Sequence, residues 1–205
     1  MSESLYSRRS NLIIGFHGTT KDRADKILGG SSGFRISNKV YDWLGKGMYF
    51  WENNYRRAEQ WAFETAKKEG KGDTPAVVGA VLDLGFCLDL TDSKCLDELK
   101  EGYNVLKESF EKDGRELPKN SLGGSSSDLL LRNLDCAVIN SLHELRKVAK
   151  MPSYDSVRGV FWEGEDLYKG AGFKAKNHIQ IAIINPNCIK GFFRPRNINK
   201  DYNNV

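Results

Sequence analysis

Three short segments of this chain carry residue types that could take part in chemistry. His17-Gly18-Thr19 follows an apolar run, and its glycine would let a ligand approach the main chain beside an imidazole and a hydroxyl. Gly45-Lys46-Gly47 stands directly before Met48-Tyr49-Phe50-Trp51, which suggests that something flat packs close to the backbone there. Asn177-His178-Ile179-Gln180-Ile181 alternates polar and apolar residues, so His178 and Gln180 should share the strand face opposite the isoleucines.

Each segment also has an interpretation without chemistry. A single histidine is more often structural than functional. A core strand with a glycine bend explains the two glycines equally well. Gln180 would then be a solvent-facing amide on an edge strand. The functional interpretation therefore depends on the order in which the three segments occur.

In that order, residues 15–61 resemble the NAD-binding core of the ADP-ribosyltransferases. The closer branch contains diphtheria toxin and the poly(ADP-ribose) polymerases. It carries a His-Gly-Ser/Thr strand, a Gly-hydrophobic-Arg-Ile segment, then Gly-Lys-Gly-Ile-Tyr-Phe, and a glutamate on a late strand. This chain has, in the same order, Phe16-His17-Gly18-Thr19, Gly33-Phe34-Arg35-Ile36 and Gly45-Lys46-Gly47-Met48-Tyr49-Phe50.

The resemblance implies roles for individual residues. His17 should hydrogen-bond a ribose hydroxyl of NAD, and the main chain of Gly18 should clamp the nicotinamide carboxamide, with Thr19 beside it. Tyr49 should stack on the nicotinamide ring. Arg35 falls where the family often contacts the adenosine or pyrophosphate part. NAD is then a co-substrate, and no metal is required.

Two positions depart from the family pattern. A second aromatic residue usually closes the nicotinamide sandwich from the helix that follows, but that position falls near Gln60, so Trp61 fills it only if the helix is shifted by one residue. The late strand offers Gln180 where glutamate is expected, which makes the signature His17-Tyr49-Gln180. Glutamine can hydrogen-bond a ribose hydroxyl without supplying charge, and losing one such electrostatic contact costs roughly 10²–10³ in rate. Growth of poly(ADP-ribose) chains is therefore not expected, whereas a single transfer remains plausible.

The acceptor is the least determined part of the function. Glu163 and Glu165 precede the Gln180 strand in a loop that helps related transferases to select the acceptor, so either could act as a base. An exposed acidic turn explains them equally well. Phe173 lies in a segment with several lysines that would suit a polyanion, with the ring stacking on a base. We favour RNA or DNA over protein, although scattered solvated lysines would also explain this pattern.

Three functional hypotheses follow. The first is a mono-ADP-ribosyltransferase that modifies a macromolecule, in the context of a toxin or antiviral defence effector with an antitoxin or immunity protein as a possible partner. The second is an NAD glycohydrolase, and the third is a non-catalytic module that binds NAD or ADP-ribose. The third hypothesis stays open because glutamine at position 180, in place of the family's glutamate, can abolish catalysis.

Composition excludes other classes of protein. The chain has 205 residues, 40% of them hydrophobic, and a net charge of +4, which permits a polyanionic partner without requiring one. No apolar run approaches the roughly 20 residues of a membrane span, and the N-terminus lacks the apolar core of a signal peptide, so we expect a cytoplasmic protein without membrane contact. The four cysteines form no CxxC pair, which argues against zinc and redox sites and favours small buried side chains.

The elements that must position these residues can be predicted from periodicity. We expect an α+β fold, which the resemblance refines to a split mixed β-sheet with flanking helices, in a single domain over residues 1–205. A helical insertion should span about 92–150, with apolar stripes at 96–110 and 130–145 and a loop at 114–127 between them. Thr20 and either Asn53 or Asn54 should cap helices. Strands are predicted at 11–17, 47–51, 76–84, 87–90, 157–162, 179–184 and 191–193.

Overall fold

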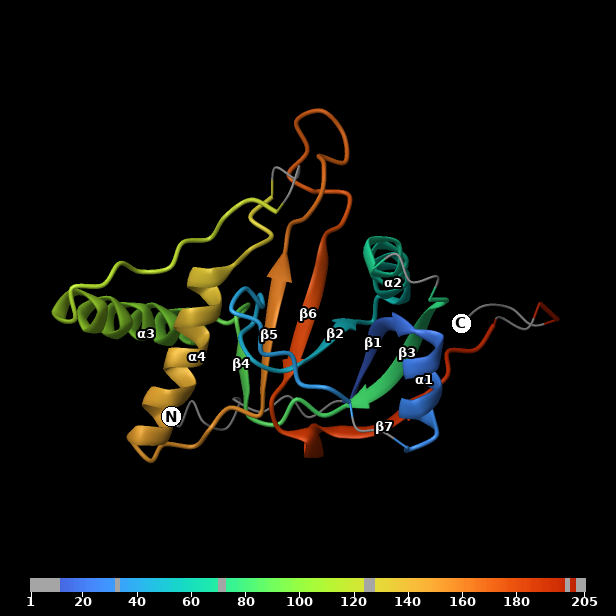
Figure 1. Ribbon diagram of the computed structural model, residues 1–205, viewed down its shortest axis with the longest axis horizontal. Coiled ribbons are helices and arrows are strands. Elements are labelled where there is room, and N and C mark those ends of the chain that lie inside the picture. Colours follow the sequence, from blue (N-terminus) through green and yellow to red (C-terminus); the bar gives the residue numbers. More distant parts are fainter. Residues whose placement is uncertain (1–11, 32–33, 70–72, 124–127, 198–199, 202–205) are drawn as a thin grey trace.

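The computed structural model describes residues 12–31, 34–69, 73–123, 128–197 and 200–201 (Figure 1). Gly33 and part of the predicted loop, at 124–127, lie outside the described residues, so their predicted roles stay untested. The strands are β1 (Ile13–Thr20), β2 (Met48–Glu52), β3 (Pro75–Leu82), β4 (Cys87–Asp89), β5 (Ser156–Phe161), β6 (His178–Ile183) and β7 (Ile189–Phe193). The helices are α1 (Lys21–Leu28), α2 (Tyr55–Glu69), α3 (Ser93–Lys112) and α4 (Asn133–Val148), and a 3-10 turn, η2 (Pro186–Cys188), precedes β7.

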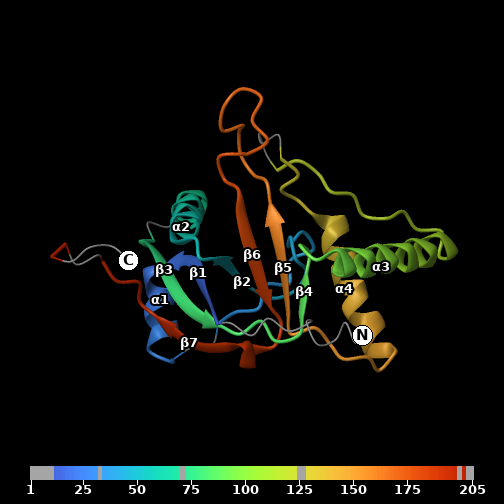
Figure 2. The same ribbon diagram turned by 180° about the vertical axis from the view of Figure 1, so that it is seen from behind.

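The strands form one mixed sheet in the order β4-β5-β6-β2-β1-β3-β7. Only β4 and β5 run parallel among its neighbouring pairs, and the other described pairs are antiparallel. The predicted α+β class is confirmed. Strands that are far apart in the sequence become neighbours, because β6 inserts between β5 and β2 in the middle of the sheet (Figures 1 and 2).

Local sequence explains where several elements begin. The Thr20 hydroxyl accepts a hydrogen bond from the Arg23 amide at the start of α1, and the Asn54 side chain accepts one from the Arg57 amide at the start of α2. Both predicted caps are confirmed. The predicted end of the first strand at His17, in a turn of Gly18-Thr19-Thr20, is wrong, since the strand continues to Thr20, where it pairs with Pro75 of β3. Pairing with a full-length partner strand outweighs the local turn preference of glycine and threonine.

Alternation along the strands gives the sheet two faces with separate cores. We call one the Phe50 face, where Phe50 packs with Leu82, Ile181 and Ile183. The other, the Tyr49 face, holds Tyr49 and Ala182 among the residues that pack with Ile139 and Leu142 of α4.

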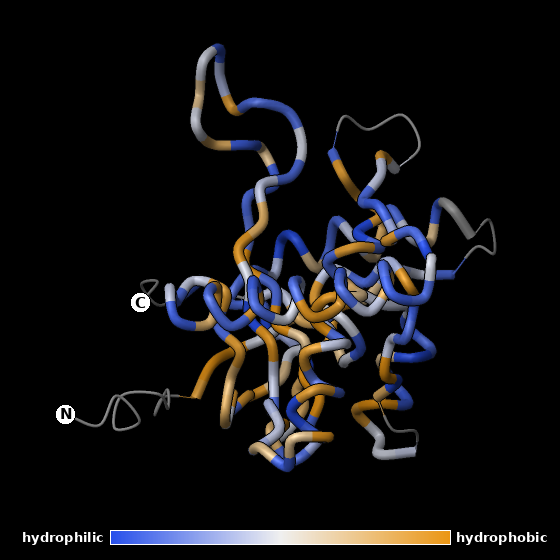
Figure 3. The backbone as a smooth tube through the Cα atoms, turned by 90° about the vertical axis from the view of Figure 1, so that its left-hand side faces the viewer, coloured by the Kyte–Doolittle hydropathy of each residue, from blue (hydrophilic) through white to orange (hydrophobic). Residues whose placement is uncertain are grey.

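The helices within 92–150 lie inside the predicted bounds. The α4 side chains pack on the Tyr49 face beside β5 and β6, whereas α2 covers the same face at β1 and β2 (Figure 1). Between these two helices, the β5–β6 connection projects beyond the body of the molecule with hydrophilic and hydrophobic residues intermixed (Figure 3). The central part of the Tyr49 face is therefore bordered by α4, α2 and this connection.

Cysteine usage agrees with the sequence interpretation. Cys87, Cys136 and Cys188 are buried and Cys95 is half-buried, and all four are free thiols. Among the described residues, we find no helix with the length and apolar character that a membrane crossing requires.

Candidate functional site

The sheet opens between β1 and β2 at the position of the predicted site. The two strands pair at Gly15–Glu52 and Phe16–Trp51, whereas β1 pairs with β3 along its whole length and β2 continues to pair with β6 as far as Met48. Beyond Phe16 and Trp51 the two strands no longer pair. A side-chain contact connects them instead, with His17 Nδ1 lying 2.9 Å from the Tyr49 carbonyl oxygen. The opening lies at the predicted site residues His17, Gly18 and Tyr49.

His17 is held as a neutral imidazole. Its ring lies on the Phe50 face, half-buried, with the Phe34 ring centroid 4.4 Å away in an edge-on arrangement. Burial is the main cause that lowers the pKa of His17 to about 4; the Tyr49 carbonyl opposes this effect and nearby Arg23 adds to it. Because a carbonyl only accepts, Nδ1 must carry the proton. Nε2 keeps a lone pair, has no described hydrogen bond, and can accept one from a hydroxyl.

Tyr49 points to the other face of the sheet and is fixed at its hydroxyl. The oxygen accepts a hydrogen bond from the Leu44 amide at 2.9 Å and donates one to the Gly45 carbonyl at 2.6 Å. Burial raises the pKa of Tyr49 far above its usual range, so the phenol stays protonated. Tyr49 thus connects the turn before β2 to the strand, and through its carbonyl it also holds His17.

The two glycines before β2 allow the chain to pack against itself. Gly45 has a φ of 73°, in the left-handed region, and a Cβ there would lie 2.7 Å from the Asn140 side chain of α4. A Cβ on Gly47 would lie 2.9 Å from that of Ala182 on β6. The close neighbours of this segment are therefore α4 and β6, as the glycine-bend interpretation expects.

Gly18 supports α2. A Cβ on Gly18 would lie 2.1 Å from the Ala58 carbonyl oxygen, so only glycine lets the helix approach β1 this closely. Its neighbour Thr19 is half-buried on β1. The helix thereby carries its own side chains over the Tyr49 face, close to the opening between β1 and β2.

Gln180 lies in the interior of the sheet. It pairs with Trp51 on β2 and with Gly159 on β5, so the edge-strand interpretation is wrong. The alternation prediction is confirmed, because Ile181 packs on the Phe50 face and Gln180 shares the Tyr49 face with Trp51. Its side chain is half-buried and makes no described hydrogen bond. The amide is available to a ligand.

A buried ion pair lies on the same face, next to Gln180 and Trp51. One nitrogen of Arg57, on α2, donates to both carboxylate oxygens of Glu163 at 2.8 Å, and both residues are buried. Lys176 Nζ and His178 Nδ1 each lie 3.8 Å from the same carboxylate. The exposed-turn interpretation is therefore wrong for Glu163, which ties the β5–β6 connection to α2.

Several polar atoms around this ion pair have no hydrogen-bond partner among the described residues. They are Trp51 Nε1, Arg57 Nε and Nη1, and His178 Nε2, all buried. Burial, with Arg57 nearby, lowers the pKa of His178, so its Nε2 is an acceptor beside three donors. Buried polar groups are normally satisfied, so such a cluster indicates bound water or a ligand group. Arg57 is not among the residues predicted from the sequence; its one signal is that an arginine lies beside Ala58 on the apolar side of a helix.

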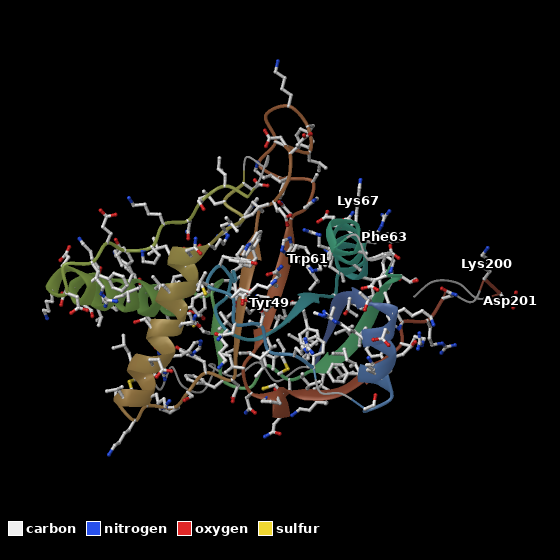
Figure 4. All side chains as sticks on the ribbon, viewed as in Figure 1. Tyr49, Trp61, Phe63, Lys67, Lys200 and Asp201 are labelled. Atoms are coloured by element: carbon white, nitrogen blue, oxygen red, sulfur yellow. The ribbon has the colours of Figure 1, made fainter. Side chains whose placement is uncertain are left out.

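The remaining predicted residues lie at the surface. Trp61 is 42% exposed on α2, and its ring centroid lies 5.8 Å from that of Trp51 (Figure 4). Arg35 is exposed on the segment that follows Phe34, and no described residue pairs with it. Glu165 and Phe173 are exposed on the β5–β6 connection. The structure thus brings His17, Gly18, Tyr49 and Gln180 onto three neighbouring strands, with Trp61 above Trp51.

Comparisons with protein-family models, with curated proteins and with solved structures found no match to this chain. Within the described residues, no group of three or more histidine, cysteine, aspartate or glutamate side chains could hold a metal ion. The geometry offers an acceptor nitrogen at His17 on the Phe50 face. On the Tyr49 face it offers the Gln180 amide, which makes no described hydrogen bond, together with Trp51, Trp61 and Arg57 under and on α2.

Proposed function

We propose that this chain is an NAD-dependent mono-ADP-ribosyltransferase with the split mixed sheet of that superfamily. The observation that carries the proposal is the opening between β1 and β2, bridged by His17, with Gln180 on the next strand, β6. At this opening His17 presents its imidazole on the Phe50 face, and Gln180 presents its amide on the Tyr49 face.

The proposed reaction breaks the bond between nicotinamide and the ribose C1′ atom. The bonding electron pair leaves with nicotinamide, C1′ develops positive charge, and a nucleophile of the acceptor then bonds to C1′ and loses its proton. From the Phe50 face, His17 Nε2 accepts a hydrogen bond from a ribose hydroxyl through the opening between β1 and β2, and the Gly18 main chain orients the carboxamide. The Tyr49 ring and Trp61 border the leaving group. These groups act by holding the reacting bond in position.

Gln180 sets the rate in this proposal. Its amide oxygen accepts a hydrogen bond from the ribose 2′-hydroxyl, and its partial negative charge stabilises the oxocarbenium-like transition state less than a carboxylate would. Single transfer to one acceptor atom needs no repeated chain growth. A glutamine at this position is compatible with that slower chemistry.

We favour a nucleic acid as the acceptor, in keeping with a toxin or defence effector. Trp162, Tyr168 and Phe173 are 53–61% exposed on the β5–β6 connection, which leaves aromatic rings free to stack on bases. Lys174 and Lys176 there are already paired with Asp166 and Glu64, so stacking carries more of this argument than charge does.

The test is incubation of the purified protein with a cell lysate and NAD labelled in its adenylate part. Portions of the product are treated with RNase, DNase or protease. We expect macromolecular label that one nuclease removes. Nicotinamide release without label would mean a glycohydrolase, and neither signal would mean a non-catalytic module.

Site variants test the assignment of residues. His17→Ala should abolish nicotinamide release, and Gln180→Ala should lower it by about 10²–10³ while changing NAD affinity much less. Gln180→Glu should raise the rate, because it introduces negative charge near C1′. Asn187→Ala, at an exposed position in η2, is the control. Wild-type rates in both the His17 and Gln180 variants would contradict the site.

A further inference from the structure

A cavity of about 460 Å³ lies between α3, α4 and β5. This volume falls within the roughly 300–1,000 Å³ range of small-molecule sites. Most of its walls are apolar, and polar groups lie among them. The lining residues that matter here are Leu96, Leu99, Val138, Lys100, Arg132 and Asp135.

One wall of the cavity is formed by flat groups. The Arg132 guanidinium carbon lies 4.6 Å from the Trp43 ring centroid and 5.0 Å from that of Phe161. The two rings are themselves 4.7 Å apart. A guanidinium held on aromatic rings offers a planar surface on which another planar group can stack.

Arg132 and Asp135 add a donor and an acceptor to that wall. Arg132 Nε is buried and has no partner among the described residues, while Nη1 of the same side chain donates to the Asp135 carboxylate at 3.1 Å. The edge of a nucleobase carries both donors and acceptors and can use both groups. An acyl chain would leave the buried Arg132 Nε without a partner.

The cavity lies beside the candidate active site. Gly159 lines it and pairs directly with Gln180 on the neighbouring strand. Adjacent strands are about 4.8 Å apart, so a group bound there comes within reach of a ribose held at Gln180. Lys100 adds a positive charge on an exposed part of α3 in the cavity lining.

We propose that this cavity binds one unpaired nucleobase of a single-stranded nucleic acid. The base stacks on the Arg132 guanidinium, its edge bonds Arg132 Nε and Asp135, and the adjoining phosphate lies near Lys100. The inference rests on the proposed transferase function and names its acceptor class. A duplex does not fit, because its bases are stacked and paired.

Two variants on α3 test the cavity without touching the sheet. Leu96 is 48% exposed, so Leu96→Trp should fill the cavity from its surface side. Lys100→Glu reverses the charge of the lining. Lys107→Glu is the matched control, since Lys107 is half-exposed on the same helix but lines a different hollow.

Binding is measured first without NAD, by fluorescence anisotropy of a fluorescein-labelled single strand of RNA, the same strand of DNA, and its duplex. Both cavity variants should weaken single-strand binding about tenfold, while the Lys107 control binds as the wild type does. Circular dichroism checks that each variant is folded. Equal loss in the control, unchanged binding in Leu96→Trp, or tighter binding of the duplex would overturn the proposal.

The transferase reaction is measured second, as label on nucleic acid per nicotinamide released. This ratio should fall about tenfold in the cavity variants. If no nicotinamide is released by any form, the proposed function fails while the anisotropy result still decides the cavity. If nicotinamide is released and the ratio is unchanged, the acceptor binds elsewhere and the cavity assignment fails alone.

Discussion

Tyr49 joins three parts of the candidate site. Its carbonyl oxygen holds the imidazole of His17, and its hydroxyl holds both Leu44 and Gly45 in the turn before β2. The ring between these two ends packs in the core of the Tyr49 face. A single side chain therefore fixes the turn before β2, and its main chain fixes the orientation of His17.

Replacing Tyr49 by phenylalanine should destabilise the protein by about 1–3 kcal/mol, because the Leu44 amide and Gly45 carbonyl lose their partner in a partly buried turn. Urea unfolding measures this change. Tyr55→Phe is the control, since its hydroxyl bonds Glu59 at the exposed surface and its loss should cost less than about 0.5 kcal/mol. Equal effects of the two substitutions would show that the Tyr49 hydroxyl does not hold the turn.

At the scale of elements, α2 is fastened to the sheet at two points. Its backbone at Ala58 rests on Gly18. The adjacent Arg57 reaches Glu163 in the β5–β6 connection. Arg57 also lies over Trp51, with its guanidinium carbon 5.7 Å from the ring centroid. The position of α2 therefore determines which side chains cover the site and where the β5–β6 connection runs.

Gly18→Ala should displace α2, because the added methyl would meet a backbone oxygen that cannot rotate away. We expect a loss of about 3 kcal/mol or more in unfolding free energy. Gly172→Ala serves as the control, since nothing lies within 4 Å of a Cβ there. A Gly18 variant as stable as the Gly172 variant would refute the close approach of α2.

Glu163→Gln should leave Arg57 as a buried charge without its partner, at a cost of about 3 kcal/mol. Hydrogen exchange should then rise in α2 and in the 162–177 connection before it rises elsewhere. The exposed Glu165 provides the comparison through Glu165→Gln, for which we expect a change below about 0.5 kcal/mol. Unchanged exchange in α2 would argue against the ion pair as its anchor.

Across the whole molecule, the three histidines lie in separate environments but share one electrostatic behaviour. His17 lies at the opening of the sheet, His143 on α4 near the Tyr154 ring, and His178 beside Glu163. Burial is the main cause that lowers the pKa of each, with nearby arginines adding to it. All three are therefore neutral in the folded protein at neutral pH.

Stability should fall as pH decreases from about 6.5 to about 4. In that range an unfolded chain binds protons at its histidines, whereas the folded protein keeps His17 neutral down to a pKa of about 4. His17 alone contributes up to about 3 kcal/mol, present in full above pH 6.5 and absent below pH 4. Urea unfolding at several pH values measures the slope. His17→Gln should flatten it, and identical slopes would contradict the low pKa.

The sequence by itself determined the elements and their faces. Alternation at His178–Ile181 fixed which side chains oppose each other, because successive strand residues must point to opposite sides. Thr20 and Asn54 marked helix starts, since their side chains satisfy amides that the helix leaves open. The motif residues could be named because each lies in a short segment that resembles a motif of a known family.

Only the tertiary structure decided which of these residues meet. Local sequence pattern does not predict that β6 inserts between β5 and β2, or that the β1–β2 ladder breaks. It also does not predict that Glu163 is buried. An acidic residue in a loop is exposed by default, and it becomes buried only when a distant arginine compensates its charge. Arg57 was missed for the same physical reason, because the pairing energy that justifies its burial comes from a residue on another element.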